Sequence, residues 1–408
     1  MPQDKKDKNL NVPPLRFPGF TDEWKENPLN QLVERVTRKN KNEESKVALT
    51  ISAQYGLVDQ EAFFNNKVAS SDLSHYYLLY KGEYAYNKSY SSGYPWGTVK
   101  RLNQYDKGVV STLYICFRPL DTVDSDFIGH YFESSKWHKG VSEIAVEGAR
   151  NHGLLNIGVK DFFSTTHFVP SLDEQKKIAK VLSLIDDRIV TQNKIIDNLQ
   201  SLIKGLNDSF HDGIQGTPIS FDQIGSSYSG LSGKNGDDFG HGSPFITYLN
   251  VYQNNIVNEK QIDLVSVDAN ESQNTISYGD VLFTLSSETP EETGIGCVYL
   301  GSSGKYYLNS FCFGVTITHP DKVYPPYLAY LVSSSKFRKF VYPLAQGSTR
   351  FNLQKSDFMR KQFTLLPIEK QKEIATILDT LNNRLSVEYK LNELYKSQKD
   401  YLLRKLFI

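Results

Sequence analysis

Several short runs in the sequence carry residue types that catalytic sites use, and each lacks a residue that the chemistry requires. An amino-methyltransferase needs Asp, Asn or Ser before Pro-Pro-aromatic, because that side chain accepts a hydrogen bond from the target amine, and in Tyr324-Pro325-Pro326-Tyr327 a tyrosine stands there. A phosphate-binding loop needs a glycine five residues before Gly233 and a hydroxyl after Lys234, and neither is present. We therefore predict no catalytic residue, and we interpret Pro325-Pro326 as a turn that leads into a helix.

The residue types that bind metals do not form a site either. The three cysteines, Cys116, Cys297 and Cys312, are too few and too scattered for a disulfide framework or a zinc site. The eight histidines form no His-x-x-x-His pair and have no Cys partner at ligand spacing, which favours ordinary surface or core histidines. No metal site is predicted, and three scattered thiols suit a reducing cytoplasm.

One stretch, residues 86–101, is rich in side chains that suit the bases and phosphates of DNA. Its basic residues are able to contact phosphates or guanine, its amide suits adenine, and its tyrosines suit the sugars. The alternative is an aromatic-rich loop that covers a core. The candidate DNA contacts in this stretch are Asn87, Lys88, Tyr90, Tyr94, Lys100 and Arg101.

The corresponding stretch in the second half of the chain, residues 284–293, has hydroxyls and acids but no basic residue. Ser287 and Glu288 are its candidate DNA contacts, because a carboxylate accepts a hydrogen bond from the amino group of cytosine. Structural turn chemistry is the alternative, and it is favoured.

Two further loops precede the long helices described below, and their position favours contact with the DNA backbone. Packing or capping at the start of the helix is the alternative for both. A glycine-rich loop supplies a third, weaker pair of candidates. The residues are Arg150, Asn151 and His152 in the first loop, Thr349 and Arg350 in the second, and Lys234 and Asn235 in the glycine-rich loop.

The elements that position these loops occur twice, because the chain repeats itself. Each copy has about 150 residues with short β-branched and aromatic runs, such as residues 109–117 and 311–317, which we predict to be strands. A helix of about 40 residues, some 60 Å long, follows in each copy. The matching residues are Gln175 with Gln371, Ile178 with Ile374, Ala179 with Ala375 and Leu182 with Leu378, always 196 positions apart.

Apolar residues in both predicted helices step by alternating fours and threes, which is a heptad pattern and predicts that the helices pair along a seam. If they pair antiparallel, a pseudo-two-fold axis relates the two copies. The predicted seam residues are Ile178, Leu182, Ile185, Ile189, Ile196, Leu199 and Ile203 in the first helix, and Ile374, Leu378, Leu381 and Leu385 in the second.

Polar residues interrupt both seams. Gln192 does so in the first helix, and Glu388, Asn392 and Lys399 do so in the second. Two interpretations stay open for Gln192, Glu388 and Asn392: they meet near the centre in a polar layer that fixes the register, or they are solvated edge residues. In the second helix an apolar stripe shifted by one residue offers another reading. Its members are Leu391, Leu394 and Tyr401.

These paired features resemble the specificity subunit of bacterial type I restriction-modification systems, over nearly the whole length of the chain. The resemblance is carried by the two helix openings at Pro170 and Pro367, each followed by Gln-x-x-Ile-Ala-x-x-Leu. It is also carried by the segments 148–157 and 347–353 ahead of them, and by the opening residues 15–24. Each motif alone is weak, but two of each in the same order are specific.

The resemblance implies two α/β (α+β) target recognition domains and two long α-helices that pair as an antiparallel coiled coil, in a pseudo-two-fold tandem duplication. The expected segments are residues 1–168 for the first domain with a short disordered lead, 169–212 for the first helix, 213–365 for the second domain and 366–408 for the second helix. Each domain would read one half of a split, asymmetric DNA site, and the helices would set the distance between the halves.

The implied partners are double-stranded DNA, two methylation subunits and two restriction subunits, in the cytoplasm and away from membranes. S-adenosylmethionine, ATP and Mg are expected only in the partner subunits. The net charge of zero argues against a free-standing DNA-binding protein, unless partners supply most phosphate contacts or a local basic cleft exists. The alternative function is a non-catalytic coiled-coil scaffold whose domains bind protein or glycan.

Overall fold

The computed structural model describes residues 11–65, 70, 72–91, 93–145, 155–212, 215–302 and 304–408. The chain divides into two compact units, of which unit 1 comprises Met1–Asn193 with Leu391–Ile408 and unit 2 comprises Lys194–Lys390. Unit 1 is therefore built from two stretches that lie far apart in the sequence. Within the described residues, no helix has the length and apolar character that crossing a membrane requires.

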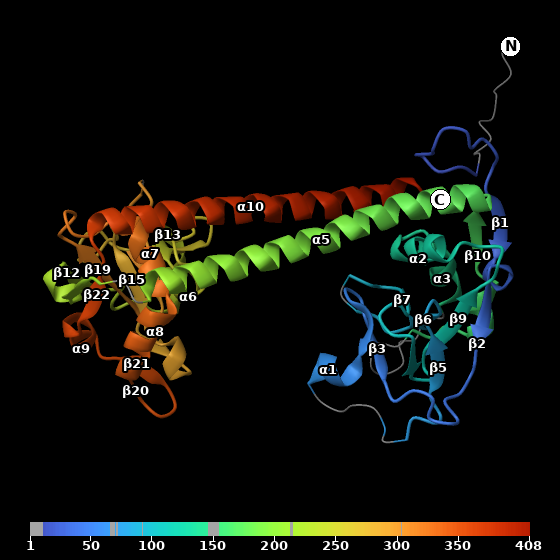
Figure 1. Cartoon of the computed structure of the whole chain (residues 1–408), viewed down its shortest axis with the longest axis horizontal. Coiled ribbons are helices and arrows are strands. Elements are labelled where there is room, and N and C mark those ends of the chain that lie inside the picture. Colours follow the sequence, from blue (N-terminus) through green and yellow to red (C-terminus); the bar gives the residue numbers. More distant parts are fainter. Residues whose placement is uncertain are drawn as a thin grey trace, which may run out of the picture. The chain divides into compact units, whose positions relative to one another are not determined.

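Unit 1 is built around a four-stranded antiparallel sheet with the strand order β2-β9-β6-β7. A separate antiparallel pair joins β1 to β10, the strand directly ahead of the long helix α5 (Figure 1). The elements of unit 1 before α5 are β1 (Lys25–Pro28), β2 (Val33–Val36), β3 (Leu49–Ser52), β4 (Gly56–Asp59), α1 (Gln60–Phe64), β5 (Tyr77–Tyr80), β6 (Tyr84–Asn87), β7 (Thr98–Arg101), β8 (Lys107–Val110), β9 (Ile115–Pro119), α2 (Ser125–Glu133), α3 (His138–Ile144), α4 (Val159–Ser164) and β10 (Thr166–Val169).

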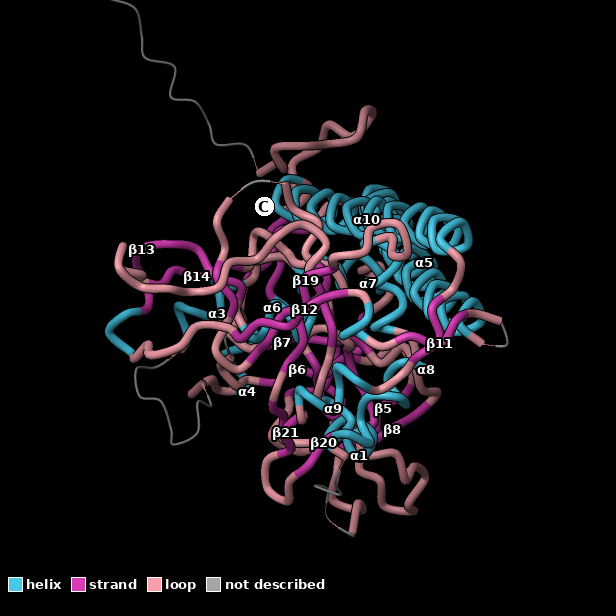
Figure 2. The backbone as a smooth tube through the Cα atoms, turned by 90° about the vertical axis from the view of Figure 1, so that its left-hand side faces the viewer, coloured by secondary structure: helices cyan, strands magenta, loops and turns pink. Residues whose placement is uncertain are grey.

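Unit 2 has the same plan, with a four-stranded sheet in the order β12-β19-β15-β17 and a separate pair of β11 with β22. Each unit also has two smaller sheets, β3-β4 and β5-β8 in unit 1 and β14-β13-β18 and β16-β21-β20 in unit 2, and Figure 2 shows β13 beside β14. The elements are β11 (Thr217–Ile219), β12 (Gly225–Ser229), β13 (Phe239–Ile246), α6 (Tyr248–Gln253), β14 (Ile262–Val265), β15 (Val281–Thr284), β16 (Ser286–Ser287), β17 (Gly296–Val298), β18 (Tyr307–Leu308), β19 (Cys312–Ile317), α7 (Pro325–Ser333), α8 (Ser335–Val341), β20 (Ala345–Gln346), β21 (Phe351–Leu353), α9 (Lys355–Arg360) and β22 (Phe363–Leu365).

The matching strand orders confirm the predicted tandem arrangement of two mixed α/β domains, each followed by a long helix. The prediction of strand for the whole run 109–117 was wrong at its centre, where a turn separates β8 from β9. The N–H of Tyr114 donates to the carbonyl of Ser111, and the Ser111 hydroxyl accepts from the N–H of Leu113. A serine side chain that bonds to the backbone ahead of it favours a turn over a strand. As interpreted from the sequence, Pro325-Pro326 begins a helix, α7.

The glutamine that recurs in both helix openings fastens each long helix to the domain in front of it. Gln175 is buried, its Nε2 donates to the Pro170 carbonyl (2.9 Å), and its Oε1 accepts from the Asp124 N–H ahead of α2 (2.8 Å). Gln371 makes the same two kinds of bond in unit 2, at 2.7 and 2.9 Å, to the segment before α10 and to the residue before α7. A buried amide without such partners is destabilising, so these bonds satisfy both groups of each glutamine side chain.

The long helices α5 (Leu172–His211) and α10 (Ile368–Lys405) run antiparallel within each unit. In unit 1 the Asn392 Nδ2 donates to Asn193 Oδ1 (2.9 Å), and Lys399 lies against Asp186 (2.5 Å). In unit 2 the Gln200 Nε2 donates to the hydroxyl of Tyr389 (2.7 Å). The residues named for the seam are buried or half-buried at every position: Ile178, Leu182, Ile185, Ile189, Ile196, Leu199 and Ile203 in α5, and Ile374, Leu378, Leu381 and Leu385 in α10.

The seam of α10 continues through its polar residues instead of shifting around them. Glu388 and Asn392 are 3% and 4% exposed, whereas Leu394 and Tyr401 are 65% and 49% exposed. The stripe shifted by one residue is therefore wrong, and so is the solvated-edge interpretation of Gln192, which is 4% exposed. A heptad position faces the partner helix whatever residue occupies it, so periodicity outweighs polarity here.

The last residues of the chain complete the core of unit 1. Phe407 is fully buried and packs against Trp24, Phe127 and Tyr131, with ring centroids 6.5, 5.3 and 5.8 Å away. The N–H of Leu15 donates to the carbonyl of Lys405, at the end of α10 (3.0 Å). The two ends of the described chain thus lie against each other in unit 1.

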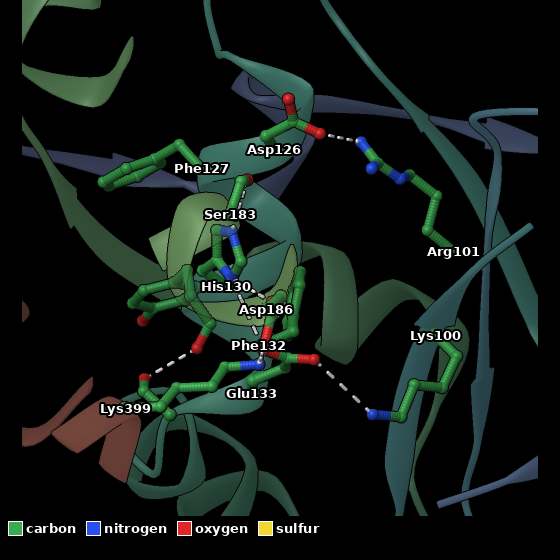
Figure 3. A network of polar contacts seen from close by, with 12 residues as sticks. Lys100, Arg101, Asp126, Phe127, His130, Phe132, Glu133, Ser183, Asp186 and Lys399 are labelled. Atoms are coloured by element: carbon green, nitrogen blue, oxygen red, sulfur yellow. Dashed lines mark hydrogen bonds and ion pairs between the residues drawn. The ribbon is translucent and has the colours of Figure 1, made fainter. Parts of the chain in front are cut away.

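A partly buried ionic network joins α10 to α2 and α5 in unit 1 (Figure 3). The ammonium of Lys399 lies 2.8 Å from Glu133 and 2.5 Å from Asp186, and His130 Nε2 lies 3.1 Å from the hydroxyl of Ser183. Atoms of His130, Glu133 and Asp186 lie within 4.8 Å of one another, a grouping that the histidine spacing did not reveal. Lys399 supplies the cation between the two carboxylates.

This network sets the ionisation of its members. Burial alone raises the pKa of Glu133, but a hydrogen bond from His130 and the charges of Lys399 and Lys100 hold that pKa far below its ordinary value of 4.5. Burial alone lowers the pKa of Lys399, but the carboxylates of Glu133 and Asp186 raise it above 10.5. Both groups are charged at neutral pH.

We expect Phe407→Ala to lower the free energy of unfolding of unit 1 by about 3–5 kcal/mol, because it leaves a cavity among three aromatic rings. All three tryptophans of the chain, Trp24, Trp96 and Trp137, lie in unit 1, so tryptophan fluorescence during urea unfolding reports this unit alone. Tyr401→Ala, on the exposed face of α10, is the control and should change the value by less than about 0.5 kcal/mol. An unchanged fluorescence transition in the Phe407 variant would contradict the shared core.

We expect Lys399→Met to lower the free energy of unfolding of unit 1 by about 1–3 kcal/mol at pH 7, because two carboxylates lose their shared cation in a partly exposed site. The lowered pKa of Glu133 stabilises the fold above pH 4.5, and this contribution disappears as the pH falls through the folded-state pKa. The difference between variant and wild type should therefore shrink below pH 4.5.

The matched control for Lys399→Met is Lys396→Met. Among the described residues, Lys396 is half exposed and bonds only to Glu393, one turn away. Its effect should stay within about 0.5 kcal/mol at every pH. A Lys399 variant whose stability deficit is the same at pH 7 and pH 4 would contradict the ionic role.

Candidate nucleic-acid interface

In unit 2 the two loops that the sequence singled out lie next to each other. Strand β16 pairs with β21 in antiparallel register, Ser286 opposite Asn352 and Ser287 opposite Phe351. The next residue on each side is Glu288 on one strand and Arg350 on the other. The acidic loop after β15 and the loop ahead of α9, 62 positions apart, therefore meet at one end of a small sheet.

The loop that carries Thr349 and Arg350 is the tip of a β-hairpin between β20 and β21, which lie side by side in Figure 2. Gly347 opens this turn at φ 145°, and a Cβ there would lie 2.0 Å from the carbonyl oxygen of Arg350. Only glycine allows so close an approach. Thr349 and Arg350 are both exposed. A two-stranded ribbon of this kind fits the major groove of DNA.

A pocket of about 280 Å³ opens at this end of the sheet. Three of the predicted contacts, Ser287, Glu288 and Arg350, line it together. Of the other lining residues, Ser286 and Glu292 belong to the stretch 284–293 but were not named as contacts, and the rest were not singled out, although the four-residue spacing of the two tyrosines places their rings on one helix face. The other lining residues are Tyr248, Leu249, Tyr252, Ser286, Glu292 and Phe311.

Hydroxyl groups hold a carboxylate in place inside this pocket. The Glu292 Oε1 accepts from the hydroxyl of Tyr252 (2.7 Å), and its Oε2 accepts from the hydroxyl of Ser287 (3.1 Å). These bonds, the one from Tyr252 first, lower the pKa of Glu292 below its ordinary value. Glu292 is therefore ionised at neutral pH and keeps Ser287, which is 8% exposed, in a fixed orientation.

A half-buried arginine fixes the acidic loop from behind. The guanidinium of Arg338 on α8 donates to the carbonyls of Glu291, Thr293 and Gly294. Burial lowers the pKa of Arg338 to about 10, which leaves it charged at neutral pH. The loop thus has the structural role that was the favoured alternative. Its fixed backbone leaves Glu288 exposed to solvent.

In unit 1 the corresponding loop runs from the end of β6 at Asn87 to the start of β7 at Thr98. Lys88 Nζ donates to the carbonyl of Ile157 (3.1 Å), and the N–H of Leu155 donates to the Lys88 carbonyl (2.9 Å). The segment just ahead of α4 is thereby joined to this loop. The same kind of link exists in unit 2, where the segment just ahead of α9 joins the loop after β15.

The loop of unit 1 has an exposed half and a packed half. Tyr90 is 61% exposed, Tyr94 is half-buried, and the Asn87 side chain accepts from the backbone of the loop. Trp96, in contrast, packs against the core, and the hydroxyl of Tyr86 donates to its carbonyl (2.7 Å). The alternative interpretation, that this loop covers a core, therefore applies only to its second half.

Three predicted basic contacts form ion pairs inside their own unit. Arg101 pairs with Asp126 (2.6 Å), and Lys100 lies 3.8 Å from Glu133, so both face α2 (Figure 3). Lys234 pairs with Glu271 (2.5 Å), a contact that raises the pKa of the lysine and lowers the pKa of the glutamate to about 2. Asn235, beside it, caps a short 3-10 helix. Arg150, Asn151 and His152 lie outside the described residues.

Comparison with known families identifies both halves of the chain. The family described as type I restriction modification DNA specificity domain matches residues 21–201 and again residues 234–395. A comparison with curated proteins found no match.

Solved structures with this fold cover almost the whole chain. A chain from a study of complex assembly and conformational transition of the type I R-M system covers 94% of this chain and 97% of its own, with 14% identity and a TM-score of 0.58. The S subunit of a type I restriction-modification system from M. genitalium covers 97% and 99%, with 15% identity and a TM-score of 0.52. At such identities these structures show the fold, and the two family matches assign the chain. It belongs to the type I restriction-modification DNA specificity family, whose members are non-catalytic DNA-recognition subunits, and it carries two specificity domains in tandem.

Proposed function

We propose that the chain reads a bipartite, asymmetric site on double-stranded DNA, one half with each specificity domain. The observation that carries the proposal is the repeated family match, one copy on each half of the chain. The candidate faces of the two units differ in chemistry: one offers Lys88 and Tyr90, the other Glu288 and Arg350. Two readers with different side chains recognise different sequences, so the halves of the site differ.

The proposed functional segments are residues 1–168 and 213–365 for recognition and residues 169–212 and 366–408 for the helices. In unit 2 the contacts are Ser287, Glu288, Thr349 and Arg350, which surround the pocket or the hairpin tip. In unit 1 they are Asn87, Lys88, Tyr90 and Tyr94, with Arg150, Asn151 and His152. Lys100, Arg101 and Lys234 form internal ion pairs and Asn235 caps a short helix, so these four take a supporting role.

The proposed partners are two methylation subunits and two restriction subunits, in the cytoplasm. S-adenosylmethionine, ATP and Mg belong to those subunits and their chemistry. The zero net charge of the chain and the internal ion pairs of Lys100, Arg101 and Lys234 favour partners as the source of most phosphate contacts. The alternative, a scaffold that binds protein or glycan, is disfavoured by the match of both halves to a DNA specificity family.

The two functions predict different outcomes in a DNA mobility-shift assay. In the presence of the methylation subunit, the chain should shift one bipartite sequence from a library at least about a thousandfold better than random duplexes of the same length. A scaffold gives no sequence-dependent shift. The proposed sequence-specific function is wrong if all duplexes shift equally at moderate salt.

We further propose that the long helices set the number of unread base pairs between the half-sites. Both α5 and α10 pass without a break from residues of one unit to residues of the other, α5 after Asn193 and α10 after Lys390. Heptad-matched insertions of seven residues at both points keep the seam in phase and lengthen each helix by about 10 Å, which is about three base pairs. The methylated motif should then gain about three unread positions and keep both half-sites.

The same seven residues inserted between Ala269 and Asn270, in an exposed turn of unit 2, serve as the control and should leave the motif unchanged. Sequencing of methylated bases in a host that carries the chain with its methylation subunit gives the motif for each variant. New half-site sequences in the helix variant, with the old spacing, would refute the proposal.

A further inference from the structure

We propose that unit 2 reads a G·C base pair, with Arg350 on guanine and Glu288 on the paired cytosine. This inference rests on the proposed DNA-reading function and names the base pair that this pocket recognises. It begins from the register of β16 and β21: because Ser287 lies opposite Phe351, Glu288 and Arg350 are the next cross-strand neighbours at the strand ends. Directly opposed residues of an antiparallel pair have Cβ atoms about 5 Å apart.

The two opposite charges stay separate despite this proximity. The guanidinium of Arg350 lies over the ring of Phe311, 5.9 Å from its centroid. Within the described residues of unit 2, the ion pairs involve other side chains, and neither Arg350 nor Glu288 forms one. Both are exposed at the rim of the pocket. Glu288 and Arg350 therefore lie exposed at one pocket without an ion-pair partner among the described residues. Together they suit a ligand that offers a hydrogen-bond donor to the carboxylate and acceptors to the guanidinium.

The charge of the pocket selects bases over phosphates. Two carboxylates, those of Glu288 and Glu292, outnumber the single guanidinium of Arg350 in the pocket lining, so the net negative charge disfavours the DNA backbone and favours amino groups. The amino group of cytosine at N4 donates to carboxylates in the major groove. The lysine-bearing loop of unit 1 has no such pair of acids in its predicted set, which makes this preference specific to unit 2.

The base that suits Arg350 is the Watson–Crick partner of the base that suits Glu288. A guanidinium donates two parallel hydrogen bonds to O6 and N7 of guanine, and this is the commonest specific contact in the major groove. Guanine pairs with cytosine, so one base pair offers the acceptors for Arg350 and the donor for Glu288. The hairpin tip presents the arginine, while Arg338 and Glu292 hold the loop that presents the acid.

The test compares the methylated motifs of the wild-type chain and three single variants, each with the methylation subunit in a host free of adenine methylation. The wild-type motif should contain a G·C pair in one half-site. Arg350→Lys keeps the charge but removes the paired donors, and Glu288→Gln keeps the shape but removes the charge. Each should reduce the preference for G·C at that one position by about tenfold or more, and leave the other half-site unchanged.

Lys305→Ala is the matched control, because Lys305 is another exposed cation of unit 2 that lies over an aromatic ring, that of Tyr307 at 5.4 Å. It should change neither half-site. Competition binding with duplexes carrying each of the four base pairs at the affected position gives a second readout that does not depend on methylation.

Three results would overturn the inference: a motif in which neither half-site contains G·C, variants that retain the wild-type preference, or variants that weaken all sites equally without relaxing one position. Equal weakening would mean that Arg350 binds a phosphate. In each of these cases a bipartite motif is still methylated, so the proposed function stands. Failure of the proposed function itself gives a different result, since no bipartite motif is then methylated by the wild-type chain.

Discussion

The return of the chain into its first unit is the constraint on which the rest of the structure depends. Helix α10 begins after the last strand of unit 2 and ends in unit 1, where Phe407 packs against Trp24 and Phe127. Because three residues of the final turns, Leu403, Leu406 and Phe407, are buried in that core, α10 has a fixed end point. The heptad seam then decides which residues of α5 and α10 face each other, and the buried glutamines decide where each helix starts.

The same constraint explains why polar groups are buried in this helix. Asn392 bonds to Asn193, and Lys399 lies between two carboxylates, at seam positions where an apolar residue would pack more simply. A buried polar group bonds well in one alignment and is left unpaired in others, so it penalises slipped registers. Because the loops that carry Lys88 and Arg350 are joined to elements that lead into the helices, a slipped register would also displace the candidate DNA contacts.

The sequence was sufficient for features that repeat or have a period. The duplication, the two helices and the family follow from Gln175 and Gln371 and from the heptads, because periodicity records which side of a helix is buried. Features made by residues far apart in the sequence were not predictable. The pocket joins Tyr248, Phe311 and Arg350, and the network joins His130, Asp186 and Lys399, each from three separate elements. Polarity misled at α10, because Lys399 is polar and nevertheless faces inward.

The two-part construction of unit 1 has a consequence for how the protein is made. A ribosome adds about 5–20 residues per second, so Trp24 leaves it tens of seconds before Phe407 does. Throughout that interval unit 1 lacks part of its apolar core, whereas unit 2, a continuous stretch from Lys194 to Lys390, has all of its residues before Phe407 is added. The residues of the second unit are therefore all present before the first unit has its whole core, in reverse of the usual order in which the N-terminal domain is completed first.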